Sequence, residues 1–169
     1  MFRIIAAAAA LIAFATAPAA AEQITYTATL NGVTEPTATG SAAAGTATIS
    51  VDTATQTIDA RIEIHGLRTG QLAQHLAHSR MGPMHLHRYQ GDDVTLILPF
   101  PFGDTYAATA DGFTVTLSDY PYADGAQRTG SRLDFAAFVA ALAGDPIFLN
   151  VHTEAFGDGE ISGRLVPAS

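Results

Sequence analysis

Apolar and polar side chains alternate along most of this chain, and that alternation limits its fold more than any other feature. Near the start, Ile24, Tyr26 and Ala28 are separated by single threonines. Neighbouring side chains of a β-strand point to opposite faces, so a period of two predicts strands that bury one face. Threonine and β-branched residues, which favour strands, fill these runs. Seven runs share the pattern: residues 23–30, 45–52, 57–67, 93–98, 112–119, 146–153 and 160–166.

Turn-forming sequences separate these runs. Asn31 and Gly32 form an Asn-Gly pair, and Ala-Asp-Gly occurs at residues 110–112 and again at 123–125. Such pairs favour tight turns because both residues tolerate positive φ. Seven or more short strands joined in this way predict an all-β fold, either an antiparallel sandwich or a barrel.

Two segments depart from the alternation. In residues 131–145, apolar residues recur at helical spacing, Ser131 is a candidate N-cap with Asp134 three residues on, and Gly144 can end the helix. We expect one short helix there, inserted before the last strands. Residues 70–82 are expected to form a short helix or an irregular loop.

The first 21 residues are typical of a secretory signal peptide. Arg3 precedes an unbroken apolar run, and Ala19 and Ala21 form an A-x-A cleavage site before Glu22. A membrane anchor is the alternative, but the run is short for a spanning helix and ends in proline and small residues. We expect residues 22–169 to be a single exported domain, periplasmic or secreted, with no membrane span.

Composition excludes one partner and restricts the chemistry. The net charge is −8 and all eight basic residues are scattered arginines, so nucleic acid is not an expected partner. The chain has no cysteine, so a transition-metal site would have to use histidines and carboxylates. No nucleophile motif or phosphate-binding loop is present in the sequence.

The segment "GPMHLH" places His85 and His87 one residue apart, directly after Gly82 and Pro83. On a strand, both imidazoles would project from the same face and could bind one ion. On a helix they would diverge, and the Gly-Pro pair disfavours a helix. The alternative is two surface histidines on an edge strand.

A third histidine favours the metal interpretation. His152 lies near the end of another predicted strand, and three imidazoles form the ligand set of zinc and copper sites with an open position. His78 is a candidate fourth ligand, ahead of His75. His65 lies on the polar face of its strand and is expected on the surface.

Carboxylates follow both histidine segments. They could orient imidazole N–H groups, although turn formation is the more common role for such residues. The four carboxylates concerned are Asp92, Asp93, Asp158 and Glu160.

Four segments, in order, resemble the CHRD (chordin-type) domain of exported bacterial proteins. They are "YTATLNGVTEPTATGSAAAGTATISVD", "TQTIDARIEIHGL", "PMHLHRYQG" and "DPIFLNVHTEAFGDGEISGRL". The last is the most specific, although Phe148 and Ser162 stand where the family usually has Tyr and Arg. The resemblance implies an immunoglobulin-like β-sandwich and an extracellular setting, without an assigned reaction.

A second, local resemblance concerns "MHLHRYQGDD" and "LNVHTEAFGDGE", which are similar to the copper-ligand segments of copper/zinc superoxide dismutase, another β-sandwich. The resemblance implies copper ligands at His85, His87 and His152. The chain lacks the disulfide of that enzyme, and His75 and His78 precede the His-x-His segment, where the zinc ligands would follow it.

These observations leave three hypotheses for function. The first is an exported module that binds copper, or else zinc, through His85, His87 and His152, with His78 as a further ligand. The second is a non-enzymatic module that binds another exported protein and whose histidines are structural. The third, least supported, is a dismutase-like redox enzyme.

Overall fold

The computed structural model describes residues 22–34 and 36–169 of the chain. The predicted signal peptide, residues 1–21, lies outside the described residues. None of the helices in the described part is long and apolar enough to cross a membrane. The strands are β1 (Gln23–Asn31), β2 (Ala44–Asp52), β3 (Thr57–His65), β4 (Met84–Gln90), β5 (Asp93–Phe100), β6 (Tyr106–Ala108), β7 (Gly112–Pro121), β8 (Ile147–Val151), β9 (Ile161–Arg164) and β10 (Val166–Pro167). The helices are η1 (Thr69–Gln71), α1 (Gln74–Ala77), α2 (Tyr122–Thr129) and α3 (Phe135–Gly144).

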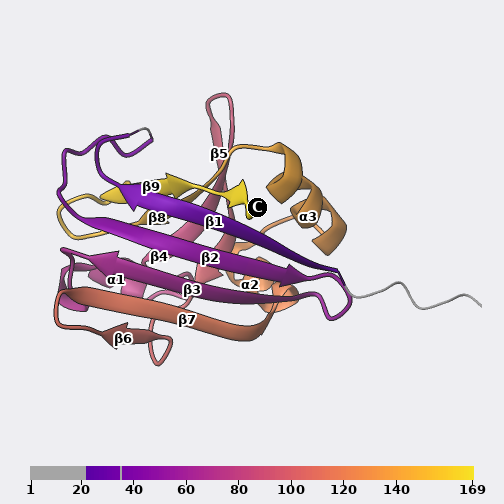
Figure 1. The fold of residues 1–169 in the computed structure, drawn as a ribbon, viewed down its shortest axis with the longest axis horizontal. Helices are drawn as coiled ribbons and strands as arrows, with labels where there is room; N and C mark the ends of the chain where they lie inside the picture. The colour runs from indigo at the N-terminus through magenta and orange to yellow at the C-terminus, as the bar shows by residue number, and fades with distance from the viewer. Residues whose placement is uncertain (1–21, 35) are drawn as a thin grey trace, which may run out of the picture.

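The strands form one antiparallel sheet in the order β5-β4-β8-β9-β1-β2-β3-β7-β6, with β10 added beside β1. The sheet curls over on itself, so that β4, β5 and β8 lie behind β1, β2 and β3 (Figure 1). The two layers are joined where β1 meets β9, through the single residue pair Asn31 and Ser162. The expected all-β fold is confirmed.

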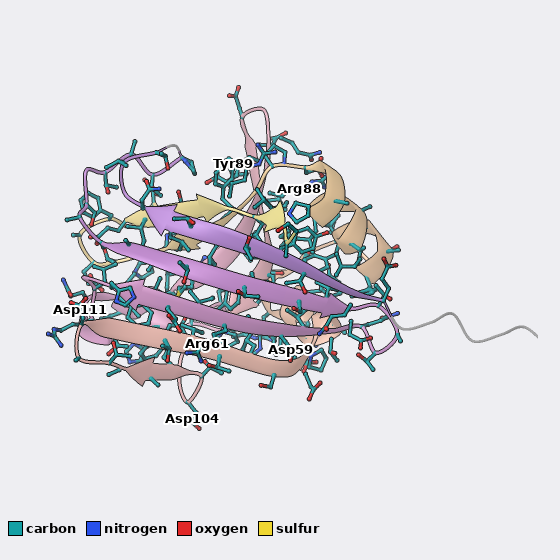
Figure 2. All side chains as sticks on the ribbon, viewed as in Figure 1. Asp59, Arg61, Arg88, Tyr89, Asp104 and Asp111 are labelled. Carbon is teal, nitrogen blue, oxygen red and sulfur yellow. The ribbon has the colours of Figure 1, made fainter. Side chains whose placement is uncertain are left out.

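The core lies between the two layers and follows the alternation of the sequence. In the front layer, Ile49, Ile58 and Ile62 are fully buried, and the immediate neighbours of each along its strand point outward. Figure 2 shows Asp59 and Arg61 on the outer side of β3. In the rear layer, Met84 and Leu86 of β4 and Leu149 and Val151 of β8 complete the same apolar cluster. The alternate side chains of β4 and β8 point to the opposite face and are not part of this apolar core.

The helix predicted near the C-terminus is present as α3, but its ends differ from the prediction. Asp134, not Ser131, is the N-cap, and its carboxylate accepts a hydrogen bond of 2.8 Å from the backbone N–H of Ala137. The helix also includes Gly144, and Asp145 is its C-cap. Asp134 caps one turn later because a carboxylate at this position satisfies a free N–H of the first turn.

A second helix, α2, was not expected, since its Ala-Asp-Gly sequence was interpreted as a turn. The helix packs against β5 and β7, and Gly125 is buried where a Cβ would press on Leu98, 2.9 Å away. Tyr122 of α2 stacks on Phe138 of α3 with ring centroids 4.5 Å apart. These contacts stabilise a glycine-containing helix against its low helical propensity.

Candidate metal centre

Strand β4 places His85 and His87 on the face that points away from the main core. Their neighbours Met84 and Leu86 are fully buried in that core. The strand pairs with β8 so that His85 lies opposite Asn150 and His87 opposite Phe148. On its other side, the pairing with β5 shifts register between Leu86 and His87. Bulges of this kind re-aim side chains and are frequent beside functional sites.

His152 reaches the same face from the residue directly after β8. Its backbone N–H donates a hydrogen bond of 2.9 Å to the carbonyl of Pro83, and its own carbonyl accepts one of 3.1 Å from Ala73. These bonds tie His152 to the segment that precedes β4 and to the start of α1. The backbone around this histidine is therefore fixed from two sides.

The three imidazoles converge. The ring centroids lie 5.5 Å apart for His85 and His87, 4.9 Å for His85 and His152, and 5.7 Å for His87 and His152. One nitrogen from each ring can be chosen so that all three lie within 4.8 Å of one another. A triangle of that size places each nitrogen about 2.8 Å from its centre, so bonds of about 2.0–2.1 Å would require the rings to move inward by less than about 1 Å. The three residues can therefore hold one metal ion.

The hydrogen bonds of these rings leave lone pairs available. The Nδ1 atom of His152 lies 2.8 Å from the carbonyl oxygen of Gly157, so in the neutral ring Nδ1 carries the hydrogen and donates it. The Nε2 atom then carries the lone pair, and it is buried without a hydrogen-bond partner among the described protein atoms. Both ring nitrogens of His85 and of His87 are also buried and unpartnered there. Buried polar atoms are normally paired, and an ion bound by one nitrogen of each ring would provide the partner for three of these five nitrogens.

Burial keeps the cluster uncharged. Burial, with smaller contributions from His152 and His87, lowers the pKa of His85 to about 3, although a backbone interaction with Gly82 opposes that shift. Burial and the neighbouring His152 lower the pKa of His87 to about 4. Burial also lowers the pKa of His152, although the Gly157 carbonyl and the Asp158 carboxylate oppose that shift. At neutral pH all three rings are therefore neutral, which is the form that binds metals.

A hollow of about 380 Å³ opens beside the cluster. The rings of His87 and His152 form part of its wall, together with Asn150 and Asp158. The remaining lining residues come from the loop after β1, the β4–β5 hairpin and the loop after β8: Pro36, Tyr89, Val94 and Gly157. Figure 2 shows Tyr89 on β4 near the upper edge of the molecule. The hollow therefore adjoins the cluster, whose unpartnered ring nitrogens are themselves buried.

The structure does not bring His78 into the cluster. His78 is exposed at the C-terminal end of α1, and its Nδ1 lies 2.8 Å from the carbonyl oxygen of Gln74 in the same helix. His75 is also exposed but lies near enough to His152 to lower its pKa. His65 is on the surface, where its Nδ1 lies 3.5 Å from the carboxylate Oδ2 of Asp111.

Sequence reasoning missed two features of the site. Asn150 is buried beside the cluster, and its position in phase with His152 was the only signal that could have marked it. Glu160 was considered as an imidazole partner, but its carboxylate instead accepts hydrogen bonds from Ser41 at 2.6 Å and Thr153 at 2.7 Å. The His152 ring is oriented by a backbone carbonyl, not by a carboxylate.

Fold and site together define an antiparallel β-domain with a buried three-histidine cluster capable of holding a metal. A family profile for the CHRD domain matches residues 26–165, so the chain belongs to the CHRD domain family. No match was found among curated proteins or among solved structures.

Proposed function

We propose that this CHRD domain binds one transition-metal ion through His85, His87 and His152 and serves in metal binding or handling outside the cytoplasm. The observation that carries the proposal is the convergence of three neutral imidazoles whose buried free nitrogens lie within 4.8 Å of one another. A protein that left these nitrogens unpaired for no purpose would lose stability, because each buried unpaired polar atom costs about 1–3 kcal/mol.

Copper is the favoured metal and zinc the alternative. An all-imidazole ligand set suits both ions, and among divalent first-row metals such a site binds copper most tightly. Three protein ligands with a hollow alongside resemble sites that keep a coordination position open rather than closed structural sites. Transfer or reversible storage of the ion would use that open side.

Export is part of the same proposal. The apolar leader ending in A-x-A at Ala19 and Ala21 supports secretion into the periplasm or beyond. In such a compartment a metal site cannot depend on the reducing conditions that keep cysteine thiols free, and this chain has no cysteine.

The competing hypothesis is an interaction module whose histidines serve only the fold. Structural histidines would hydrogen-bond to their surroundings, yet both ring nitrogens of His87 and the Nε2 atom of His152 have no such partners in the described part of the chain. This observation favours the metal proposal.

Metal content and titration of the purified protein test the proposal. We expect one equivalent of Cu(II) or Zn(II) per chain and a lower metal content after replacement of His85 and His87 by glutamine. The His65→Gln variant is the matched control, since His65 is exposed and away from the cluster. Absence of stoichiometric binding to the native chain would refute the proposal.

A further inference from the structure

Asn150 lies beside the three-histidine cluster. It lies directly across from His85 in the β4–β8 pairing and two residues before His152 on the same face. Paired residues of adjacent antiparallel strands have Cβ atoms about 4.5–5.5 Å apart, so the carboxamide is a close neighbour of the imidazoles. Its side chain also lines the hollow beside His87 and His152.

Only one of the two polar atoms of the Asn150 carboxamide has a hydrogen-bond partner among the described protein atoms. The residue is 2% exposed, and its Nδ2 donates a hydrogen bond of 3.3 Å to the hydroxyl of Tyr89. Its Oδ1 atom is buried and has no hydrogen-bond partner among the described protein atoms. An unpaired buried carbonyl oxygen is unfavourable, and in native proteins such atoms nearly always have a partner. This oxygen therefore lacks a hydrogen-bond donor. A small ligand in the hollow, which Asn150 lines, could provide that donor.

We propose that Asn150 selects what binds at the open position of the metal: its Oδ1 accepts a hydrogen bond from a metal-bound water or another small ligand with an O–H or N–H group. This inference rests on the proposed function, because it requires an ion on the three histidines. Tyr89 is a positioning residue, since its hydroxyl holds the amide nitrogen and leaves the oxygen as the free end.

The same arrangement disfavours anions without protons. Such an anion would bring its lone pairs against those of Asn150 Oδ1, and the Asp158 carboxylate lines the same hollow. The net charge of −8 adds a field that repels small anions from the whole surface. A ligand with an O–H or N–H group can instead donate a hydrogen bond to Asn150 Oδ1 or to the Asp158 carboxylate.

Azide binding to the Cu(II)-loaded protein tests the role of Asn150. Azide can bind copper but has no hydrogen to donate, and its copper charge-transfer absorption reports binding directly. In Asn150→Ala we expect unchanged copper stoichiometry and roughly tenfold tighter azide binding, the effect of removing one unfavourable polar contact. Asn150→Asp nearly preserves the shape of the side chain and keeps its acceptor oxygens, so it is expected to weaken azide binding. This variant provides the test if Asn150→Ala does not fold.

Two tyrosine variants separate positioning from general packing. Tyr89→Phe frees the carboxamide, so azide binding should tighten by less than in Asn150→Ala. Tyr120→Phe is the matched control, because Tyr120 also has a buried hydroxyl without a partner but lies on β7 in the other layer. It should leave azide binding unchanged.

The outcomes distinguish this inference from the proposed function. Azide affinity that is equal in the native chain and in Asn150→Ala, with one copper still bound, would overturn the role of Asn150 alone. Loss of copper from a folded Asn150→Ala variant would also overturn it, because Asn150 would then be a ligand itself. Failure of the native chain to bind copper would instead refute the proposed function.

Discussion

The imidazole rings of His85 and His152 lie with centroids 4.9 Å apart, although one belongs to β4 and the other follows β8. Two protonated rings at this separation would repel each other, and their burial adds a desolvation cost to either charge. The pair is therefore neutral at physiological pH and presents lone pairs rather than charges. A cation that enters between them would provide the partner that the described protein atoms do not.

Replacement of His152 by alanine should lower the affinity for Cu(II) by more than about 100-fold. A lost ligand costs more than the 10- to 100-fold that outer-sphere partners of metal ligands typically contribute. Competition titration against a chelator of known affinity measures the change. His78→Ala is the matched control and should bind copper like the native protein, since His78 is exposed and outside the cluster. Equal losses in the two variants would contradict the three-histidine site.

The metal-free protein should lose stability as the pH falls from about 6.5 to about 4. The unfolded chain protonates its histidines near their ordinary pKa of 6.5, whereas the folded chain protonates His87 only near 4 and His85 only near 3. Because the unfolded state binds more protons in this window, the free energy of unfolding decreases with decreasing pH. Each histidine contributes about 1.4 kcal/mol per pH unit.

Urea denaturation at pH 7 and pH 4.5 measures this dependence. Carboxylates also titrate in the window, so the informative quantity is the difference between the native chain and the His85→Gln, His87→Gln double variant. The double variant should show a shallower loss of stability, whereas His65→Gln should match the native chain. Identical slopes in the native chain and the double variant would mean that burial does not hold these rings neutral.

Glu160→Ala should destabilise the protein by about 1–3 kcal/mol. Its buried carboxylate accepts hydrogen bonds from Ser41 and Thr153, so its removal leaves the O–H groups of these two residues without their acceptor. Thermal or urea denaturation measures the loss. Glu63→Ala is the control, because Glu63 forms an exposed ion pair with Arg61 that contributes at most about 1 kcal/mol. A smaller loss for Glu160→Ala than for Glu63→Ala would contradict this role.

Gly82→Ala should destabilise the protein more than Gly91→Ala. Both glycines have positive φ, 74° and 59°, so alanine is strained at either position by about 1–2 kcal/mol. At Gly82 the new Cβ would also clash with the carbonyl oxygen of Phe100, whereas at Gly91 nothing lies within 4 Å. The clash would displace the start of β4, and copper affinity should fall with stability. Equal denaturation midpoints for the two variants would show that the backbone contact at Gly82 can relax.

The strands and the shared face of His85 and His87 were predictable from sequence because both depend on local periodicity. Alternation identified the buried faces of β1, β2 and β3, and the one-residue spacing of His85 and His87 required only that the segment be a strand. Strand pairing then brings His152 to the same face, which sequence could suggest only through its phase within a predicted strand.

The features that sequence did not predict depend on tertiary contacts. The helix α2 contains Gly125, which helical propensity opposes, and it forms because a small residue can pack beside Leu98 and Tyr120. Asn150 resembles any polar residue of a half-buried strand until β4 is placed beside it. Glu160 occurs in a turn-like sequence, and only the approach of the loop after β1 shows that it is buried and paired.

X-ray absorption spectroscopy of the copper-loaded native protein tests the central claim most directly. We expect one Cu(II) per chain with three imidazole nitrogens at about 2.0–2.1 Å and a further light-atom ligand from solvent. The His85→Gln, His87→Gln double variant should lose the multiple-scattering pattern of these imidazoles. A copper environment with one imidazole or none, or a spectrum unchanged in that variant, would contradict the account.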